Sequence, residues 1–293
     1  MENQVDMTQQ QQIQVDPVSG ALGAEISGVD LRAPIGDDLV EEIRSALLDN
    51  HVLFFHDQEL DPEAQAKVGA RFGELEDYPF VEPLAGHPKV IPVIKEPHET
   101  SNFGGGWHTD LIYRPQPSMA TMLYAVEVPK RGGDTLFADG VLAFRALSAR
   151  MQDLLTTLRV EYNVRHLAHT MIQRGNGAST GNRSMPSRVD KAVLDTSPVH
   201  PLVRTHPETG ERALYFSREH TINFEDMTPG ESRPLLDWLE SHMTQPVFTT
   251  RFHWRKGSIA FWDNRCVSHC ALNDYQGERR HMHRLTIAGD TPR

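Results

Sequence analysis

Short apolar segments, each separated from the next by proline, glycine or a polar turn, recur along most of this chain. Each is long enough for a strand but too short for a typical helix, and breaks of this kind favour antiparallel pairing. The segments expected to form strands are residues 51–56, 121–126, 198–205, 213–217, 248–254, 258–262 and 284–288. We therefore expect a mainly β protein of the α+β class, with helices flanking a double sheet.

Four segments carry helix signals instead of strand signals. Residues 37–50 and 142–158 repeat apolar side chains at helical spacing. Asp61 precedes a proline and predicts the N-cap of a third helix, for which Gly73 would be the C-cap. Thr228 has a glutamate three residues later, the pattern of a capping box, and predicts a fourth helix.

The chain is expected to form a single domain from residue 13 to residue 293, because no linker or repeat divides it. Residues 1–12 are polar and rich in glutamine, and we expect a disordered tail there. Residues 168–195 are rich in small and polar residues with little periodicity. A loop of that length is either a functional lid or disordered, and the sequence leaves both readings open.

The charge balance limits the partners. With 40 acidic residues against 29 Lys and Arg, the net charge of −11 argues against a broad nucleic-acid-binding face. Two cysteines cannot form a disulfide framework, so the cytoplasm is the expected compartment. No run of 18 apolar residues predicts a membrane span.

The sequence Trp-His-Thr-Asp at 107–110 offers two metal ligands. On a strand, His108 and Asp110 would point to the same face. His269, which follows a strand and a polar turn, is the candidate third ligand. Two histidines and one carboxylate suit non-haem Fe(II), which needs open positions for oxygen and a co-substrate. A zinc hydrolase with similar ligands is the chemical rival.

Further motifs surround these residues in a fixed order. They are Gly-Ala-Leu-Gly-Ala-Glu-Ile at 20–26, Gly-Gly-Asp-Thr at 132–135, Trp-Asp-Asn at 262–264 and Arg-Arg-His-Met-His-Arg at 279–284. Together with the ligand candidates, they resemble the taurine dioxygenase family of Fe(II)- and 2-oxoglutarate-dependent oxygenases, from about Ile13 to Pro292. The resemblance implies a double-stranded β-helix (jelly roll), Fe(II) as cofactor, and 2-oxoglutarate and O2 as co-substrates.

The resemblance also implies roles for individual residues. His108, Asp110 and His269 match the iron ligands of the family. Thr135 and Arg280 match the pair that binds the distal carboxylate of 2-oxoglutarate, and a guanidinium suits that task because it binds a carboxylate bidentately. Arg284 matches the arginine that faces the anionic group of the substrate.

The substrate side departs from taurine dioxygenase itself. Where that enzyme uses a histidine and a tyrosine, this chain has Tyr78 and Val81, and where it uses an asparagine, this chain has Gly104. Taurine is therefore an unexpected substrate, while Arg284 still calls for an anion. We expect a larger, more apolar sulfonate, sulfate ester, carboxylate or phosphonate.

Other readings and residues stay open at this point. The same ligands could serve a metal-dependent hydrolase or a sensor that binds a metal or a small anion. Family members commonly form homodimers or homotetramers, and one of these is expected here. Some residues carry a plain structural reading as the expectation: the loop residues Arg165, His166, His169, Arg174, Arg183 and Arg188, the packing residues Trp107, Tyr215, Phe216, Trp262, Cys266 and Cys270, and the strand residues His281 and His283.

Overall fold

A seven-stranded sheet forms the larger layer of the computed structural model, which describes residues 12–164, 184–185, 188 and 190–293. Its strands, in spatial order, are β1 (Gln14–Pro17), β2 (Ala24–Ser27), β3 (Val52–Phe55), β13 (Ile259–Asp263), β5 (Ala120–Glu127), β15 (Arg280–Ile287) and β4 (Ile91–Lys95). All neighbours pair antiparallel except β2 and β3, which are parallel. Residues 1–11 of the predicted tail and most of residues 168–195 lie outside the described residues.

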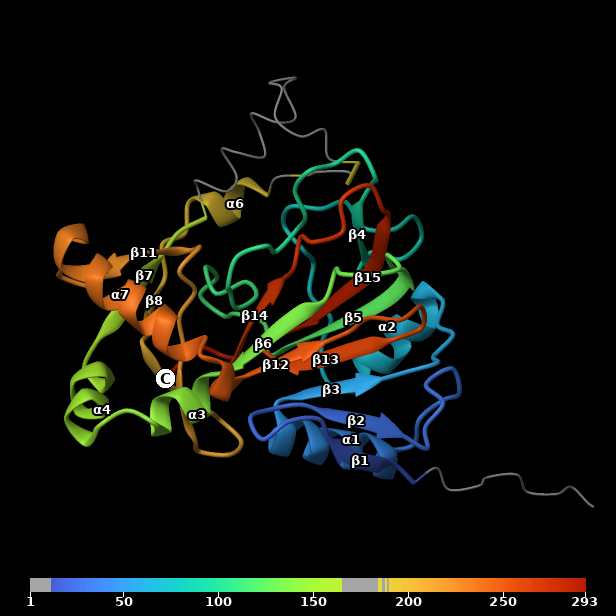
Figure 1. Cartoon of the computed structure of the whole chain (residues 1–293), viewed down its shortest axis with the longest axis horizontal. Helices are drawn as coiled ribbons and strands as arrows, with labels where there is room; N and C mark the ends of the chain where they lie inside the picture. The colour runs from blue at the N-terminus through green and yellow to red at the C-terminus, as the bar shows by residue number, and fades with distance from the viewer. Residues whose placement is uncertain (1–11, 165–183, 186–187, 189) are drawn as a thin grey trace, which may run out of the picture.

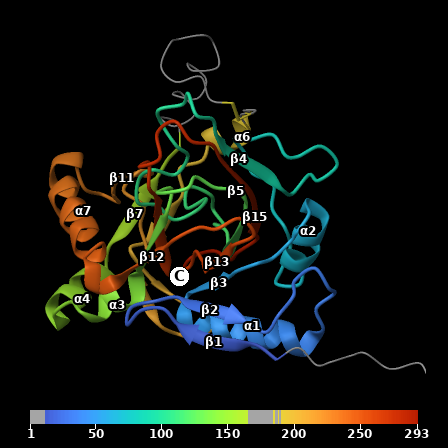
Figure 2. The same cartoon turned by 45° about the vertical axis from the view of Figure 1, so that its right-hand side comes forward.

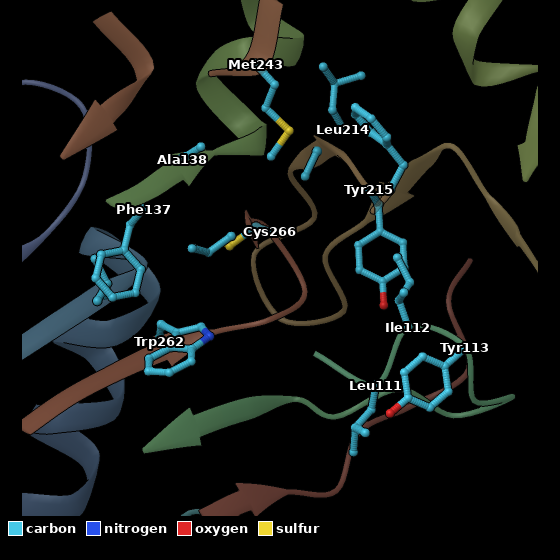
Figure 3. Close-up of a cluster of buried hydrophobic side chains, with 14 of the residues drawn as sticks. Leu111, Ile112, Tyr113, Phe137, Ala138, Leu214, Tyr215, Met243, Trp262 and Cys266 are labelled. Carbon is cyan, nitrogen blue, oxygen red and sulfur yellow. The ribbon is translucent and has the colours of Figure 1, made fainter. Parts of the chain in front are cut away.

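A smaller sheet packs against the inner face of the large one. It consists of β12 (Thr249–Phe252), β6 (Thr135–Asp139) and β14 (Val267–Ala271). Phe54 of the large sheet stacks on Phe252 at 4.1 Å between ring centroids and contacts Phe137 at 5.7 Å. Trp262 meets Phe137 from the same side at 5.5 Å (Figure 3). The two layers form the expected double-stranded β-helix.

Two helices cover the outer face of the large sheet, α1 (Asp37–Asn50) and α2 (Pro62–Ala70) (Figure 1). Strand side chains alternate between the two faces, so β15 places Met282 in the inner core and Leu285 and Ile287 in the outer one. Arg280, Met282 and Arg284 therefore share the inner face, as predicted. His281 and His283 lie on the other face.

The remaining elements lie outside these two layers, most of them on the side of the barrel away from α2 (Figure 2). They are α3 (Gly140–Arg145), α4 (Ala149–Thr156), α6 (Lys191–Leu194), α7 (Pro229–Met243) and the 3-10 turn η1 (Pro246–Phe248), with a sheet of β11 (Thr221–Phe224), β7 (Arg159–Tyr162) and β8 (Val199–Pro201) and the pair β9 (Val203–Thr205) and β10 (Arg212–Leu214). In the part of the chain that the structure describes, no helix is long and apolar enough to cross a membrane.

Helix starts follow the sequence more closely than helix ends. The helix at 37–50 is confirmed, Asp61 caps α2 and Thr228 forms the predicted capping box of α7. The C-cap of α2 is Arg71, so the prediction of Gly73 was wrong. The single helix expected at 142–158 was also wrong, because the chain ends α3 and restarts as α4 with Ser148 as the new N-cap.

Each segment predicted to be a strand contains a strand, but the bounds of several strands differ from the predicted bounds. Residues 198–205 form two strands, β8 and β9, which belong to different sheets. In the segment 213–217, only Ala213 and Leu214 are in a strand, as the end of β10. β15 begins at Arg280, four residues before the predicted start, so it carries both of the arginines singled out in the sequence. Its polar N-terminal half hides this from a search for apolar runs.

Candidate active site

The two candidate ligand histidines are joined through their own backbones. The His108 N–H donates to the His269 carbonyl at 3.0 Å, and the His269 N–H donates to the His108 carbonyl at 2.8 Å. His269 lies on β14, whereas His108 stands in an isolated bridge at the end of the 101–107 loop. This pairing brings the two imidazole rings to 4.2 Å between centroids.

Asp110 completes the cluster. One carboxylate oxygen, Oδ1, lies 3.7 Å from His108 Nε2 and 3.8 Å from His269 Nε2. Asp110 begins a turn and is not on a strand, so the strand alternation used to predict the convergence was wrong, although the convergence itself is real. All three side chains are buried. Their ligand atoms lie within 4.8 Å of one another, which is compact enough to hold one metal ion.

Hydrogen bonding and charge prepare these groups as ligands. His108 Nδ1 contacts the Gly106 carbonyl at 2.8 Å, so Nδ1 carries the proton and Nε2 keeps its lone pair for a metal. Burial lowers the pKa of His269 to about 3, with help from His108 and Arg284. Burial alone would raise the pKa of Asp110, but Arg284, the two histidines and the Thr121 hydroxyl outweigh it and lower that pKa to about 2. The donor set is therefore Nε2 of His108, the neutral imidazole of His269 and the Asp110 carboxylate.

A cavity between the two sheets opens beside His108 and His269. Thr135, Trp262, Arg280 and Arg284 also line it, together with Val93, Phe103, Gly104, Leu123 and Ala271. Arg280 is buried, and its Nε and Nη2 have no hydrogen-bond partner among the described residues. A buried guanidinium with free donors calls for an anion, and 2-oxoglutarate supplies one at each end.

Thr135 is arranged to assist Arg280. Its Oγ1 accepts a hydrogen bond from Trp254 Nε1 at 3.0 Å. Because an indole N–H can only donate, the hydroxyl proton of Thr135 remains available for an acceptor in the cavity. The Trp254 ring also lies 5.7 Å from the Arg280 guanidinium carbon. No motif in the sequence marks this contribution from Trp254, because it depends on the pairing of β12 with β6.

The comparisons with known proteins agree with this geometry. A family model described as taurine catabolism dioxygenase TauD, TfdA family, matches residues 14–286. This chain belongs to that family. It is therefore an Fe(II)- and 2-oxoglutarate-dependent dioxygenase, and the hydrolase and sensor alternatives fall away.

Individual relatives of this dioxygenase match over nearly the whole chain. An alpha-ketoglutarate-dependent sulfate ester dioxygenase of Pseudomonas putida is 30% identical over 96% of this chain and 91% of its own length. A crystal structure described as a taurine dioxygenase from Burkholderia xenovorans has 36% identity and a TM-score of 0.79, covering 96% of this chain and 92% of the other. The crystal structure of AAD-2 in complex with Mn(II) and N-oxalylglycine has 28% identity and a TM-score of 0.77, with coverages of 96% and 99%.

A second cavity of the dioxygenase adjoins the first, and the two share His108 and Arg284 in their linings, while Asp110 lines the second. Its lining includes Tyr78, Gly104 and four residues that the sequence did not single out, Asn102, Tyr113, Glu219 and His220. Glu219 and His220 come from the segment before β11, far from the recognised motifs. No pattern within the sequence marks them, because only the fold brings that segment to the site.

Arg284 lies where the two cavities meet. Its Nη2 is 2.8 Å from Asp110 Oδ1, and its guanidinium carbon is 4.8 Å from the centre of the Tyr78 ring. Burial lowers the pKa of Arg284, but Asp110, Tyr78 and Tyr113 outweigh that effect and raise it, so the group is a permanent buried cation. Its Nε has no hydrogen-bond partner among the described residues.

Two of the predicted substrate positions differ in their surroundings. Gly104 has φ of +73°, and a Cβ added to it would lie 3.0 Å from Cε1 of His108. An asparagine there would press on a candidate ligand, so the backbone itself explains the glycine. Val81 is buried in the core and is not among the lining residues of either cavity. A substrate contact by Val81 stays a prediction.

A second cluster with metal-ligand chemistry, formed by His206, Asp263 and Cys266, has a structural explanation. Asp263 Oδ1 accepts a hydrogen bond from Arg265 Nε at 2.8 Å and Oδ2 accepts one from Arg265 Nη2 at 2.5 Å, and His206 Nε2 lies 3.1 Å from the same Oδ2. Burial raises the pKa of the Cys266 thiol, which favours the protonated form. Cys266 packs among buried side chains, and both cysteines are free and buried, as expected (Figure 3).

A third hollow of the described residues lies away from this chemistry. It is lined by residues 31–35 and by α2, and its cations Arg32, Lys67 and Arg71 are each paired with a carboxylate.

Most of the loop residues to which the sequence assigns a structural role lie outside the described residues. These are Arg165, His166, His169, Arg174 and Arg183. Arg188, which the structure describes, donates a hydrogen bond from Nε to the backbone carbonyl of Tyr78 at 3.0 Å. Tyr78 lines the second cavity.

Proposed function

We propose that this dioxygenase hydroxylates a small organic substrate carrying one anionic group, with Arg284 as the residue that binds the anion. The observation that carries the proposal is the position of Arg284, a buried cation at the junction of two cavities and directly beside Asp110. Arg284 is paired with Asp110 through Nη2, but its Nε has no hydrogen-bond partner among the described residues and can donate to an anion. An anion bound there would hold the rest of the substrate close to the metal-ligand cluster.

Within this proposal the other residues divide the work. His108, Asp110 and His269 would hold Fe(II), and Arg280 with Thr135 would hold the distal carboxylate of 2-oxoglutarate. When bound, iron and 2-oxoglutarate supply the oxidation of a C–H bond with O2, together with formation of succinate and CO2. The protein residues contribute position and charge, and the buried setting keeps water from the reacting groups.

The substrate class follows from what surrounds Arg284. Tyr78 and Tyr113 line the second cavity and offer aromatic surface, which suits a substrate with an apolar body behind its anionic group. A sulfonate, sulfate ester, carboxylate or phosphonate fits, and the similarity to a sulfate ester dioxygenase supports this range. Taurine fits less well, because Gly104, which stands where taurine dioxygenase has an asparagine, offers no polar side chain to the small polar body of taurine.

An anaerobic binding experiment tests the proposed roles. Fe(II) and 2-oxoglutarate added to the protein without oxygen should give a weak visible charge-transfer band, and His108→Ala and Asp110→Ala should each abolish it. A folded, iron-loaded wild-type sample without the band would contradict the ligand assignment. Candidate anions are then screened in air for stimulated formation of succinate. If neutral analogues stimulate the reaction as well as the matched anions do, the anion-binding role of Arg284 is wrong.

A further inference from the structure

The two oxygens of Asp110 lie in different surroundings. Oδ1 faces Nε2 of His108 and His269, at 3.7 and 3.8 Å, and the Arg284 guanidinium. Oδ2 points away from the histidines and accepts a hydrogen bond from Thr121 Oγ1 at 2.6 Å. This short, charge-assisted hydrogen bond fixes Oδ2 and leaves Oδ1 available to a metal.

Thr121 is in turn held by a neighbouring amide. Asn264 Nδ2 donates to Thr121 Oγ1 at 2.9 Å, and Trp262 Nε1 donates to Asn264 Oδ1 at 2.9 Å. These three side chains are almost completely buried, with exposures of 1% or less. The series runs from Trp262 through Asn264 and Thr121 to Asp110, and we name it the donor chain.

The donor chain has a fixed direction. An indole N–H can only donate, so the amide oxygen of Asn264 must face Trp262, and its NH2 group must face Thr121. Thr121 Oγ1 then accepts from Asn264, and the single hydroxyl proton of Thr121 is directed to Asp110 Oδ2. The orientation of each side chain therefore follows from that of its neighbour, beginning with Trp262, whose indole N–H can only donate.

The backbone keeps these residues in place. Thr121 on β5 and Trp262 on β13 are directly opposite partners in the antiparallel pairing, so their side chains share the inner face. Asn264 follows β13, and its N–H donates to the Met119 carbonyl at 2.8 Å. Trp262 packs on Phe137 (Figure 3). The donor chain therefore starts from two central strands of the large sheet.

We infer that Trp262, Asn264 and Thr121 are positioning residues that hold Asp110 so that Oδ1 alone faces the metal. The inference rests on the proposed function, because it takes Asp110 as a metal ligand. Residues behind a ligand typically change metal affinity by about 10- to 100-fold when they are lost. A purely structural role would instead affect folding and leave metal affinity unchanged.

Metal titration of matched variants tests the donor chain. Co(II), added anaerobically without 2-oxoglutarate, is followed by calorimetry and by its visible spectrum. Thr121→Val keeps the shape of the side chain and removes the hydroxyl, and it should weaken Co(II) binding by about 10- to 100-fold and alter the spectrum. Thr121→Ser restores the hydroxyl and should return both toward wild type. Thr286→Val is the control, since Thr286 lies opposite Thr121 on β15 and no hydrogen bond of the described residues joins it to Asp110.

Asn264→Asp provides a second, independent variant. The new carboxylate can still accept from Trp262, but its other oxygen would accept the Thr121 proton and withdraw it from Asp110. The same loss of Co(II) affinity is expected, and this variant decides the question if Thr121→Val does not fold. Wild-type affinity in both folded variants would overturn the inference while leaving the proposed function intact. Failure of the wild-type protein itself to bind Co(II) would instead overturn the proposed function.

Discussion

Arg280 and Arg284 lie on the same face of β15, four residues apart, yet their surroundings differ. Arg284 contacts the carboxylate of Asp110, whereas Arg280 has unpartnered nitrogens beside Thr135 and Trp254. Burial lowers the pKa of Arg280, with partial opposition from Tyr275 and Asp134. The two guanidiniums are therefore suited to two different anions.

Alanine substitutions should separate the two arginines. Arg280→Ala should raise the KM for 2-oxoglutarate by at least about 10-fold, because a charge-assisted bidentate contact is lost. Arg284→Ala should mainly raise the KM for the primary substrate. Steady-state kinetics with each of the two substrates varied in turn measure both effects. The opposite pattern would show that the roles are exchanged.

Single residues explain how far the sequence predicted the site. Short motifs carry His108, Asp110, His269, Thr135 and Arg280. The structure places four of them in the lining of one cavity and Asp110 in the lining of the second. The geometric argument for His108 and Asp110 was wrong, since Asp110 lies in a turn. Glu219 lines the second cavity without any motif, because its position depends on how the segment before β11 packs.

Helix α2 is the element that supports the arginine-bearing strand from behind. Gln65 of α2 donates from Nε2 to the His283 carbonyl at 3.1 Å, and a Cβ on Gly69 would lie 2.8 Å from a methyl carbon of Leu285. The start of α2 was predictable, because the Asp61 cap acts within four residues. The break between α3 and α4 was not, because the apolar spacing continues through Leu147 and hides the N-cap at Ser148.

Removing the cap of α2 should cost stability. Asp61 accepts a hydrogen bond from the Ala64 N–H at 2.7 Å, so Asp61→Ala should lower the free energy of unfolding by about 1 kcal/mol. Urea denaturation measures the change. Asp61→Asn, which keeps an acceptor at the same place, is the control and should remain close to wild type. An equal loss in both variants would mean that the charge, and not the cap, matters.

At the scale of the whole molecule, the large sheet has apolar side chains on both faces. Its inner face meets the small sheet, and its outer face meets α1 and α2. His283 faces outward in this arrangement and is buried. Burial, with smaller contributions from the nearby His281 and His87, lowers the pKa of His283 to about 4.

This burial predicts a loss of stability in mild acid. Above pH 6.5 His283 is neutral in both the folded and the unfolded chain. As the pH falls from 6.5 toward 4, only the unfolded chain takes up the proton, so the folded state loses stability across that window. Solvent screening limits the effect to about 1 to 2 kcal/mol. The Tm of His283→Gln should fall less between pH 7 and pH 4.5 than the Tm of the wild type. Equal falls of Tm in the two proteins would contradict the prediction.

The mutual backbone bonds between His108 and His269 have a consequence for the order of events in folding. These residues are about 160 positions apart, and closing so long a loop costs entropy that local contacts cannot offset. The backbone pairing of His108 and His269 therefore forms only after the segments that carry them have come together in the folded barrel. An ion that needs both of them binds the finished fold and cannot serve as its template, so it stabilises by mass action after the barrel has closed.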